Sequence, residues 1–135
     1  MTSRPLVVTL SWDEALRFTV QAGESQLVLD SSSQAGPSPV QALVAALAGC
    51  MAMDVVDILK KGRHPLTGLS ATLTATRADE APARLTQVDL QYRVSGPVPE
   101  SAVQRAIQLS REKYCSVWHS LRQDIELTVT CAVED

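Results

Sequence analysis

The stretch from Ser38 to Gly62 constrains the fold more than any other part of this chain. It begins with Ser38, Pro39 and Gln41, the pattern of a capping box in which the serine and glutamine side chains each satisfy a free backbone N–H group. It ends with two lysines and Gly62, which we expect to adopt the left-handed conformation that closes many helices. The residues between them predict one helix of about 23 residues, which at 1.5 Å per residue is ~34 Å long.

This helix is apolar on nearly every side, which is typical of a helix buried among neighbours. Four small residues between positions 45 and 49 keep its middle thin, so another backbone can approach closely, and Cys50 follows directly. The uncharged run from Pro39 to Met53 is shorter than the ~18–20 residues that a bilayer requires, and Asp54 comes next. We therefore predict a core helix that does not span a membrane.

The composition predicts a globular chain that does not bind nucleic acid. The 135 residues are 45% hydrophobic and 20% charged, with a net charge of −3 and no basic block, so we expect one domain, residues 1–135, and no nucleic acid partner. The N-terminal sequence has no long apolar run, so we expect no secretory signal. The three cysteines form no C-x-x-C pair, which favours the reducing cytoplasm and argues against a disulfide framework or a metal site.

Alternating apolar residues predict strands on both sides of the central helix. The predicted order, β-β-β-α-β-β-α-β, does not alternate strands with helices, so we predict an α+β fold with a mostly antiparallel sheet around the long helix. A turn is expected at residues 12–15. The predicted elements are strands 6–10, 17–21, 26–29, 69–77, 85–94 and 124–133, and helices 39–61, 99–113 and 116–121.

The positions of the other two cysteines in the predicted elements indicate different roles for them. Cys115 lies beside the N-terminus of the short helix, where a thiolate is stabilised, and Ser116 is the predicted cap of that helix. Cys131 belongs to the apolar face of the last strand, so we predict that it is buried in the core. Cys50 and Cys115 are therefore the two cysteines that lie outside the strand faces.

Two segments of the chain resemble the OsmC/Ohr family, which comprises osmotically inducible protein C and the organic hydroperoxide resistance proteins. The first is A-L-A-G-C-M-A-M-D-V, which contains Cys50, and the second is R-A-I-Q-L-S-R-E-K-Y-C-S-V, which contains Cys115. The order of elements fits the family too, so the resemblance spans most of the chain. It implies an intertwined homodimer with two long helices packed at its centre and sheets on the outside.

The resemblance also implies an activity. In this family two cysteines at the subunit interface reduce organic hydroperoxides without a metal or prosthetic group, and Cys50 matches the peroxidatic position and Cys115 the resolving one. The Cys50 thiolate attacks the O–O bond and becomes a sulfenic acid, Cys115 condenses with it to a disulfide, and an external dithiol restores both thiols. The apolar neighbours Leu47, Met51 and Met53 suit an organic hydroperoxide better than hydrogen peroxide.

One position departs from the family pattern. In the peroxidases a Glu follows the Pro that opens the long helix and orients an Arg onto the thiolate, whereas here Val40 stands there and Gln41 follows. Arg17 is the N-terminal candidate for that Arg. A buried thiol without a paired Arg has its pKa raised and is a poor nucleophile. Two other functions therefore stay open: a redox-sensing or non-enzymatic dimer that keeps both thiols, and a small-molecule binding protein that uses the apolar interface.

Two carboxylates share the helix face of Cys50. Around the helix axis, Asp54 lies about 40° and Asp57 about 20° from Cys50. Carboxylates that are removed from water are rarely unpaired, so we expect one of these two to pair with a cation, Arg111 or Lys113. Our hypothesis is that a cation held in this way, from this chain or from a partner chain, stabilises the Cys50 thiolate.

Overall fold

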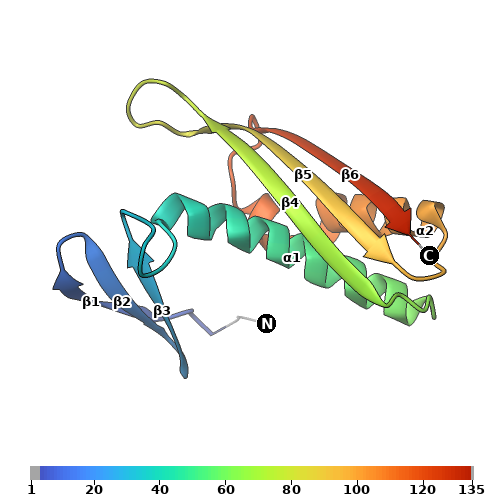
Figure 1. Ribbon diagram of the computed structural model, residues 1–135, viewed down its shortest axis with the longest axis horizontal. Coiled ribbons are helices and arrows are strands. Elements are labelled where there is room, and N and C mark those ends of the chain that lie inside the picture. Colours follow the sequence, from blue (N-terminus) through green and yellow to red (C-terminus); the bar gives the residue numbers. More distant parts are fainter. Residues whose placement is uncertain (1–3, 135) are drawn as a thin grey trace. The chain divides into compact units, whose positions relative to one another are not determined.

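A computed structural model of the chain describes residues 4–134, which divide into two compact units, one up to Leu43 and one from Val44 (Figure 1). The α+β class and the predicted order of elements are confirmed. The first unit holds β1 (Val8–Glu14), β2 (Arg17–Ala22) and β3 (Ser25–Asp30), and α1 (Pro39–Lys61) begins there and continues into the second unit; the second also holds β4 (Gly68–Arg77), β5 (Leu85–Ser95), α2 (Glu100–Leu109), a π-helical turn (Ser110–Tyr114), α3 (Ser116–His119) and β6 (Glu126–Glu134).

The first unit is an antiparallel sheet in the order β1-β2-β3. The turn predicted at residues 12–15 is wrong, because β1 continues to Glu14 through a bulge after Trp12, and the turn lies at Ala15 and Leu16. The indole N–H of Trp12 donates a 2.8 Å hydrogen bond to the carbonyl of Ala15, which has a positive φ of 46°. This local bond helps to close the hairpin after Glu14, whereas the sequence prediction placed Asp13 and Glu14 inside the turn.

One face of this first sheet is apolar and largely uncovered. The side chain of Trp12 is 69% exposed and that of Leu10 is 56% exposed, whereas Val20 on the central strand is buried. A sheet face of this kind is normally packed against another layer of structure. The residues that share the face are Val8, Leu10, Trp12, Phe18, Val20, Leu27 and Leu29.

Helix α1 has the predicted bounds, because its caps are local. The backbone N–H of Gln41 donates to Ser38 Oγ at 3.2 Å, and the N–H of Ser38 donates to Gln41 Oε1 at 2.9 Å, which confirms the capping box. The left-handed residue at the other end is Arg63, with φ of 61°, rather than Gly62. The N–H groups of residues 63 and 64 bond back to the carbonyls of residues 60 and 59, a Schellman motif that places Gly62 one position before the left-handed residue.

One stripe of α1 is fully buried, and it consists of Leu47, Met51, Val55 and Leu59. Their spacing of four residues places them along one line of the helix. Other sides of α1 are open, and Met53 is 74% exposed. Among the described residues, α1 alone is long and apolar enough to cross a membrane, by length and composition only, a property that core helices of soluble proteins share.

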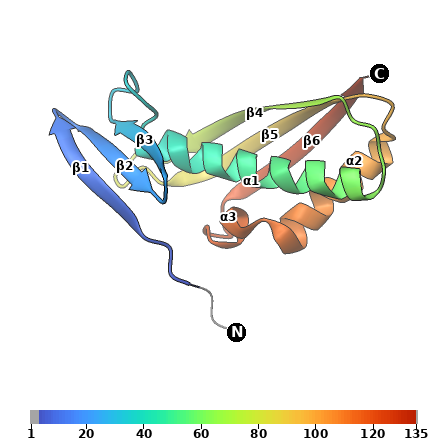
Figure 2. The ribbon, with the colours of Figure 1, turned by 90° about the horizontal axis from the view of Figure 1, so that it is seen from below.

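The second sheet has the order β4-β5-β6, with β4 and β5 antiparallel and β5 and β6 parallel. The parallel pair needs a crossover, which the segment containing α2 supplies. Helices α1 and α2 lie along the same face of this sheet (Figure 2). That face includes the four fully buried residues of β5 that the alternation predicts, and the other face is polar. The four are Val88, Leu90, Tyr92 and Val94.

The predicted second helix, residues 99–113, agrees with a helical segment that runs from Glu100 to Tyr114, but its last turn, Ser110–Tyr114, is π-helical, so α2 itself ends at Leu109. Two local predictions in the second unit are wrong. Cys115, not Ser116, is the N-cap of α3, because its sulfur accepts the backbone N–H of Trp118 at 3.4 Å. Cys131 is half-buried rather than part of the core, because β6 is an edge strand with a neighbour on one side only.

Candidate active site

Two free thiols lie next to each other in the second unit. Helix α1 supplies Cys50, which is half-buried, and the end of the π-helical turn supplies Cys115, which is fully buried. The two thiols interact closely enough for Cys50 to act as a hydrogen-bond partner of Cys115. The two cysteines that the resemblance assigns to one disulfide therefore lie side by side as free thiols.

The environment of Cys115 keeps its proton in place. The pKa of this thiol is raised from an ordinary 9.0 to about 11, mostly by burial and in smaller part by the interactions with Cys50 and with Asp54. The N–H of Trp118 opposes these causes by donating to the sulfur. At neutral pH Cys115 is thus a protonated thiol beside Cys50.

Asp54 is held by a hydroxyl group and not by the predicted cation. Ser110 Oγ donates a 2.7 Å hydrogen bond to its carboxylate, and Ser110 is fully buried. Lys113, one of the two cations expected there, instead lies 5.3 Å from the centre of the Tyr114 ring. The expectation of an Arg111 or Lys113 partner is therefore corrected for Asp54.

Asp57 lies on the exposed part of the same helix face. Its carboxylate is 2.9 Å from Lys61 Nζ, one turn further along α1, and both side chains are more than half exposed. The cation that it binds is therefore a neighbour on its own helix, not the predicted Arg111 or Lys113. Exposed pairs of this type contribute little to stability because water and salt screen them.

Tyr92 completes the group of polar side chains around the thiols. Its hydroxyl donates a 2.8 Å hydrogen bond to the carbonyl of Ala48 on α1, and its ring is buried. Burial is the largest cause that raises the pKa of Tyr92, and the nearby Cys115, Asp54 and Cys50 raise it too. The phenol therefore remains neutral and fixes the β5 strand to the helix turn that precedes Cys50.

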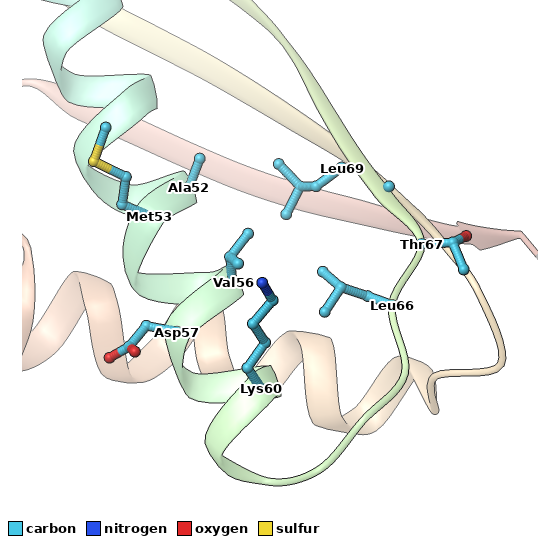
Figure 3. A pocket seen from close by; sticks show the side chains of 9 residues that line it. Ala52, Met53, Val56, Asp57, Lys60, Leu66, Thr67 and Leu69 are labelled. Carbon is cyan, nitrogen blue, oxygen red and sulfur yellow. The ribbon is translucent and has the colours of Figure 1, made fainter.

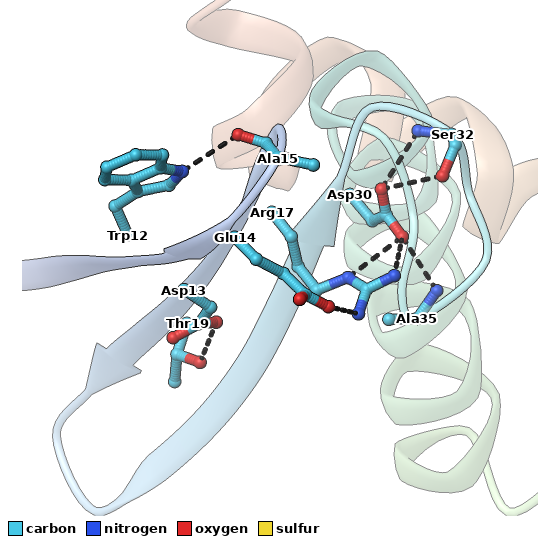
Figure 4. A network of polar contacts seen from close by, with 9 residues as sticks. All are labelled: Trp12, Asp13, Glu14, Ala15, Arg17, Thr19, Asp30, Ser32 and Ala35. Atoms are coloured by element: carbon cyan, nitrogen blue, oxygen red, sulfur yellow. Dashed lines mark hydrogen bonds and ion pairs between the residues drawn. The ribbon is translucent and has the colours of Figure 1, made fainter.

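A separate polar network in the first unit holds Arg17 (Figure 4). Its guanidinium is 2.9 Å from Glu14 and 3.3 Å from Asp30, which is 4% exposed. Asp30 also accepts the backbone N–H groups of Ala35 at 2.9 Å and Ser32 at 3.0 Å, and these bonds, with Arg17, hold the pKa of the carboxyl well below its usual range. Arg17 is thus a fixed cation with a buried carboxylate behind it.

An open pocket of about 610 Å³ lies along the C-terminal half of α1 (Figure 3). Its walls come from one side of the helix and from the segment around the start of β4, and Val56 faces Leu66 and Leu69 across the space between them. The residues are mostly apolar, with a charged rim. They are Ala52, Met53, Val56, Asp57, Lys60, Leu66, Thr67, Gly68 and Leu69.

Comparison with known proteins identifies the family. The family model described as OsmC-like protein matches residues 31–130, which include both cysteines of the pair. The chain belongs to the OsmC-like family. Protein YhfA of Escherichia coli K12 is 38% identical over 122 residues, which are 88% of this chain and 91% of that protein.

Solved structures share the OsmC-like fold. A hypothetical protein from Aquifex aeolicus VF5 has a TM-score of 0.92 and 25% identity, covering 98% of this chain and 99% of that one. An organic hydroperoxide resistance protein from Elizabethkingia anophelis has a TM-score of 0.70 and 14% identity, covering 98% of each chain. At that identity the second likeness shows the fold alone.

Some functional groups of this OsmC-like protein have only a weak signal in the sequence. The D-S-S run at Asp30 is typical of an Asx turn, so its backbone bonds were predictable, but its pairing with Arg17 depends on strand register. Ser110 and Tyr92 meet α1 only through tertiary packing. Gln41 serves the helix cap and also accepts from Ser33 Oγ at 2.7 Å. Among the described residues, no three His, Cys, Asp or Glu side chains group as metal ligands.

Proposed function

We propose that this OsmC-like protein is a thiol-dependent peroxidase that reduces organic hydroperoxides in the cytoplasm. The observation that supports the proposal most directly is the neighbouring pair of free thiols, Cys50 half-buried and Cys115 fully buried. A half-buried thiol admits a small oxidant, and a buried neighbour protects the oxidised sulfur from other reactants. Met53, the exposed apolar residue three positions after Cys50 on α1, favours an organic substrate.

The proposed reaction has three balanced steps. The Cys50 thiolate attacks the O–O bond of the hydroperoxide, that bond breaks, and the alcohol leaves with a proton, so that Cys50 becomes a sulfenic acid. The sulfur of Cys115 then attacks the Cys50 sulfur, the S–O bond breaks, and hydroxide leaves with the Cys115 proton as water. An external dithiol reduces the resulting disulfide by thiol–disulfide exchange and is itself oxidised.

We also propose that the protein acts as a homodimer. The resemblance to the family implies this assembly, and the exposed apolar surface supports it. Trp12 on the first sheet and Met53 on α1 are each more than half exposed, and the apolar pocket along α1 offers a surface for a second copy. Exposed apolar areas of this extent on soluble proteins usually mark an interface.

A direct assay tests the peroxidase. Reduced protein is mixed with cumene hydroperoxide and dithiothreitol in a stopped-flow instrument, and peroxide consumption is followed. We expect Cys50→Ser to abolish turnover, and Cys115→Ser to consume one equivalent and leave a sulfenic acid that dimedone traps. Cys131→Ser, on the edge strand, is the matched control and should retain turnover. Reduced native protein that consumes no hydroperoxide would overturn the proposal.

One observation favours a second candidate, a redox-sensing dimer without peroxidase turnover. Asp54 in the second unit has its carboxylate close to the thiol pair, and a carboxylate opposes ionisation of a nearby thiol. Such a protein still forms the Cys50–Cys115 disulfide, but only with slower oxidants such as oxidised glutathione. Disulfide formation without cumene hydroperoxide turnover identifies this candidate.

A further inference from the structure

Ser110 connects the two segments that carry the thiols. Its hydroxyl donates the 2.7 Å hydrogen bond to Asp54 on α1, and its carbonyl accepts the backbone N–H of Cys115 at 2.8 Å. The residue is fully buried and is the first of the π-helical turn. A single residue thus bonds through its side chain to the helix of Cys50 and through its backbone to Cys115.

Asp54 links Ser110 to the helix turn that carries Cys50. It lies one helical turn after Cys50, so the spacing between the two residues is fixed by the α-helix itself. Its hydrogen bond to Ser110 is charge-assisted, and such bonds are shorter and about twice as strong as neutral ones. Cys50 is therefore linked to Cys115 through two intermediate residues. The α-helix fixes Asp54 relative to Cys50, and hydrogen bonds join Asp54 to Ser110 and Ser110 to Cys115.

The π-helical turn shapes the part of this link between Ser110 and Cys115. The backbone bond from Cys115 to Ser110 spans five residues instead of the four of an α-helix, and Cys115 itself has an extended backbone, with φ of −73° and ψ of 98°. Irregular turns of this type are frequently found at functional sites. The hydrogen bond from Ser110 to Asp54 holds the start of this turn against α1.

We propose that the hydrogen bond from Ser110 to Asp54, here called the Asp54–Ser110 clasp, positions Cys115 against Cys50 for disulfide formation. The inference rests on the proposed use of these two cysteines as a redox pair. Asp54 and Ser110 are positioning residues, and the clasp raises the effective concentration of one thiol at the other. Without it the π-helical turn moves relative to α1, and the disulfide closes less readily.

The reaction that tests the clasp needs no hydroperoxide. In glutathione buffers the two protein thiols exchange with oxidised glutathione to give the protein disulfide and two reduced glutathione molecules, so atoms and electrons balance. The equilibrium constant of this exchange measures how well the two sulfurs are aligned. A protein without peroxidase activity still gives this constant, so failure of the clasp and failure of the peroxidase proposal are distinguishable.

The experiment uses the full chain with Cys131→Ser throughout. We expect Ser110→Ala to lower the equilibrium constant by about tenfold, the size expected for losing a hydrogen bond to a charged group. Asp54→Asn keeps an oxygen that accepts from Ser110, and we expect a loss of less than about threefold, because a neutral bond is weaker but has the same geometry. Ser101→Ala, at an exposed position on α2, is the matched control and should leave the constant unchanged.

Two outcomes would overturn the proposal. An unchanged constant for Ser110→Ala shows that the clasp does not align the thiols, and a larger loss for Asp54→Asn than for Ser110→Ala shows that the charge acts instead of the bond. Should Ser110→Ala fail to fold, Asp54→Ala removes the same bond from the other side and carries the same expectation. In a separate experiment with cumene hydroperoxide, dimedone trapping adds a kinetic readout, because slower closure lets the Cys50 sulfenic acid accumulate.

Discussion

Arg17 and Asp30 are cross-strand partners on β2 and β3, and the guanidinium lies 3.3 Å from the carboxylate. Asp30 is thus a carboxylate that fixes an arginine. Val40, which stands where the peroxidases of the family have a Glu, cannot fill that role. The sequence led us to expect that Asp54 or Asp57 holds the cation, but the structure pairs Asp54 with a serine and Asp57 with a lysine. Arg17 as the cation that serves the Cys50 thiolate stays a prediction, and Asp30 becomes its anchor.

The first prediction tests Arg17 through alkylation of Cys50. We expect Arg17→Ala and Asp30→Asn to slow the reaction of Cys50 with iodoacetamide at pH 7 by about tenfold, because a nearby cation favours the reactive thiolate form of a cysteine. Glu14→Gln removes only the exposed partner of Arg17 and should change the rate little. Equal rates in all four proteins would show that the arginine serves only the first sheet.

The second prediction concerns the pH dependence of stability. The pKa of Asp30 is lowered in the folded state from its ordinary 3.8, so its contribution to stability is present above about pH 4 and is lost as the pH falls below that value. The difference in free energy of unfolding between native protein and Asp30→Asn should be constant from pH 7 to pH 4 and then shrink. Urea titrations at a fixed protein concentration measure it. A difference that grows below pH 4 contradicts the assignment.

The parts of the fold that local chemistry determines were predictable. Helix α1 begins and ends where its capping residues indicate, and the buried face of β5 follows from alternation. The parallel pairing of β5 with β6 was not predictable, because it depends on a crossover that brings distant residues together. The half-buried state of Cys131 follows from the position of β6 at the edge of the sheet, which the sequence does not encode locally.

The candidate site was predictable to a similar extent. The thiol pair followed from motifs that resemble a known family, and the structure places the two cysteines together. The partner of Asp54 was missed because a serine in a predicted helix does not indicate which side chain it will bond, and the contact of Ser110 with α1 is made between distant parts of the chain. Side-chain partners across elements depend on packing, which a single sequence specifies weakly.

The third prediction is a homodimer that depends on the open side of α1. Light scattering after size exclusion should give twice the chain mass of 14.5 kDa. Met53→Asp places a charge on an exposed apolar position beside the pocket, and we expect it to weaken association by at least about tenfold, because burying an unpaired charge is costly. Thr74→Asp, on the exposed polar face of β4, is the control. A folded native monomer at micromolar concentration contradicts the prediction.

The last prediction concerns the alkaline limb of stability. The pKa of Cys115 is raised from 9.0 to about 11 in the folded state, so the unfolded chain loses this proton first and the free energy of unfolding falls as the pH rises from 9 to 11. Below pH 9 both states hold the proton, and this thiol causes no pH dependence. Cys115→Ser cannot ionise in this range, so its stability should fall less steeply than that of a Cys131→Ser parent in which Cys115 is retained. Parallel curves would show that burial does not shift the pKa of Cys115.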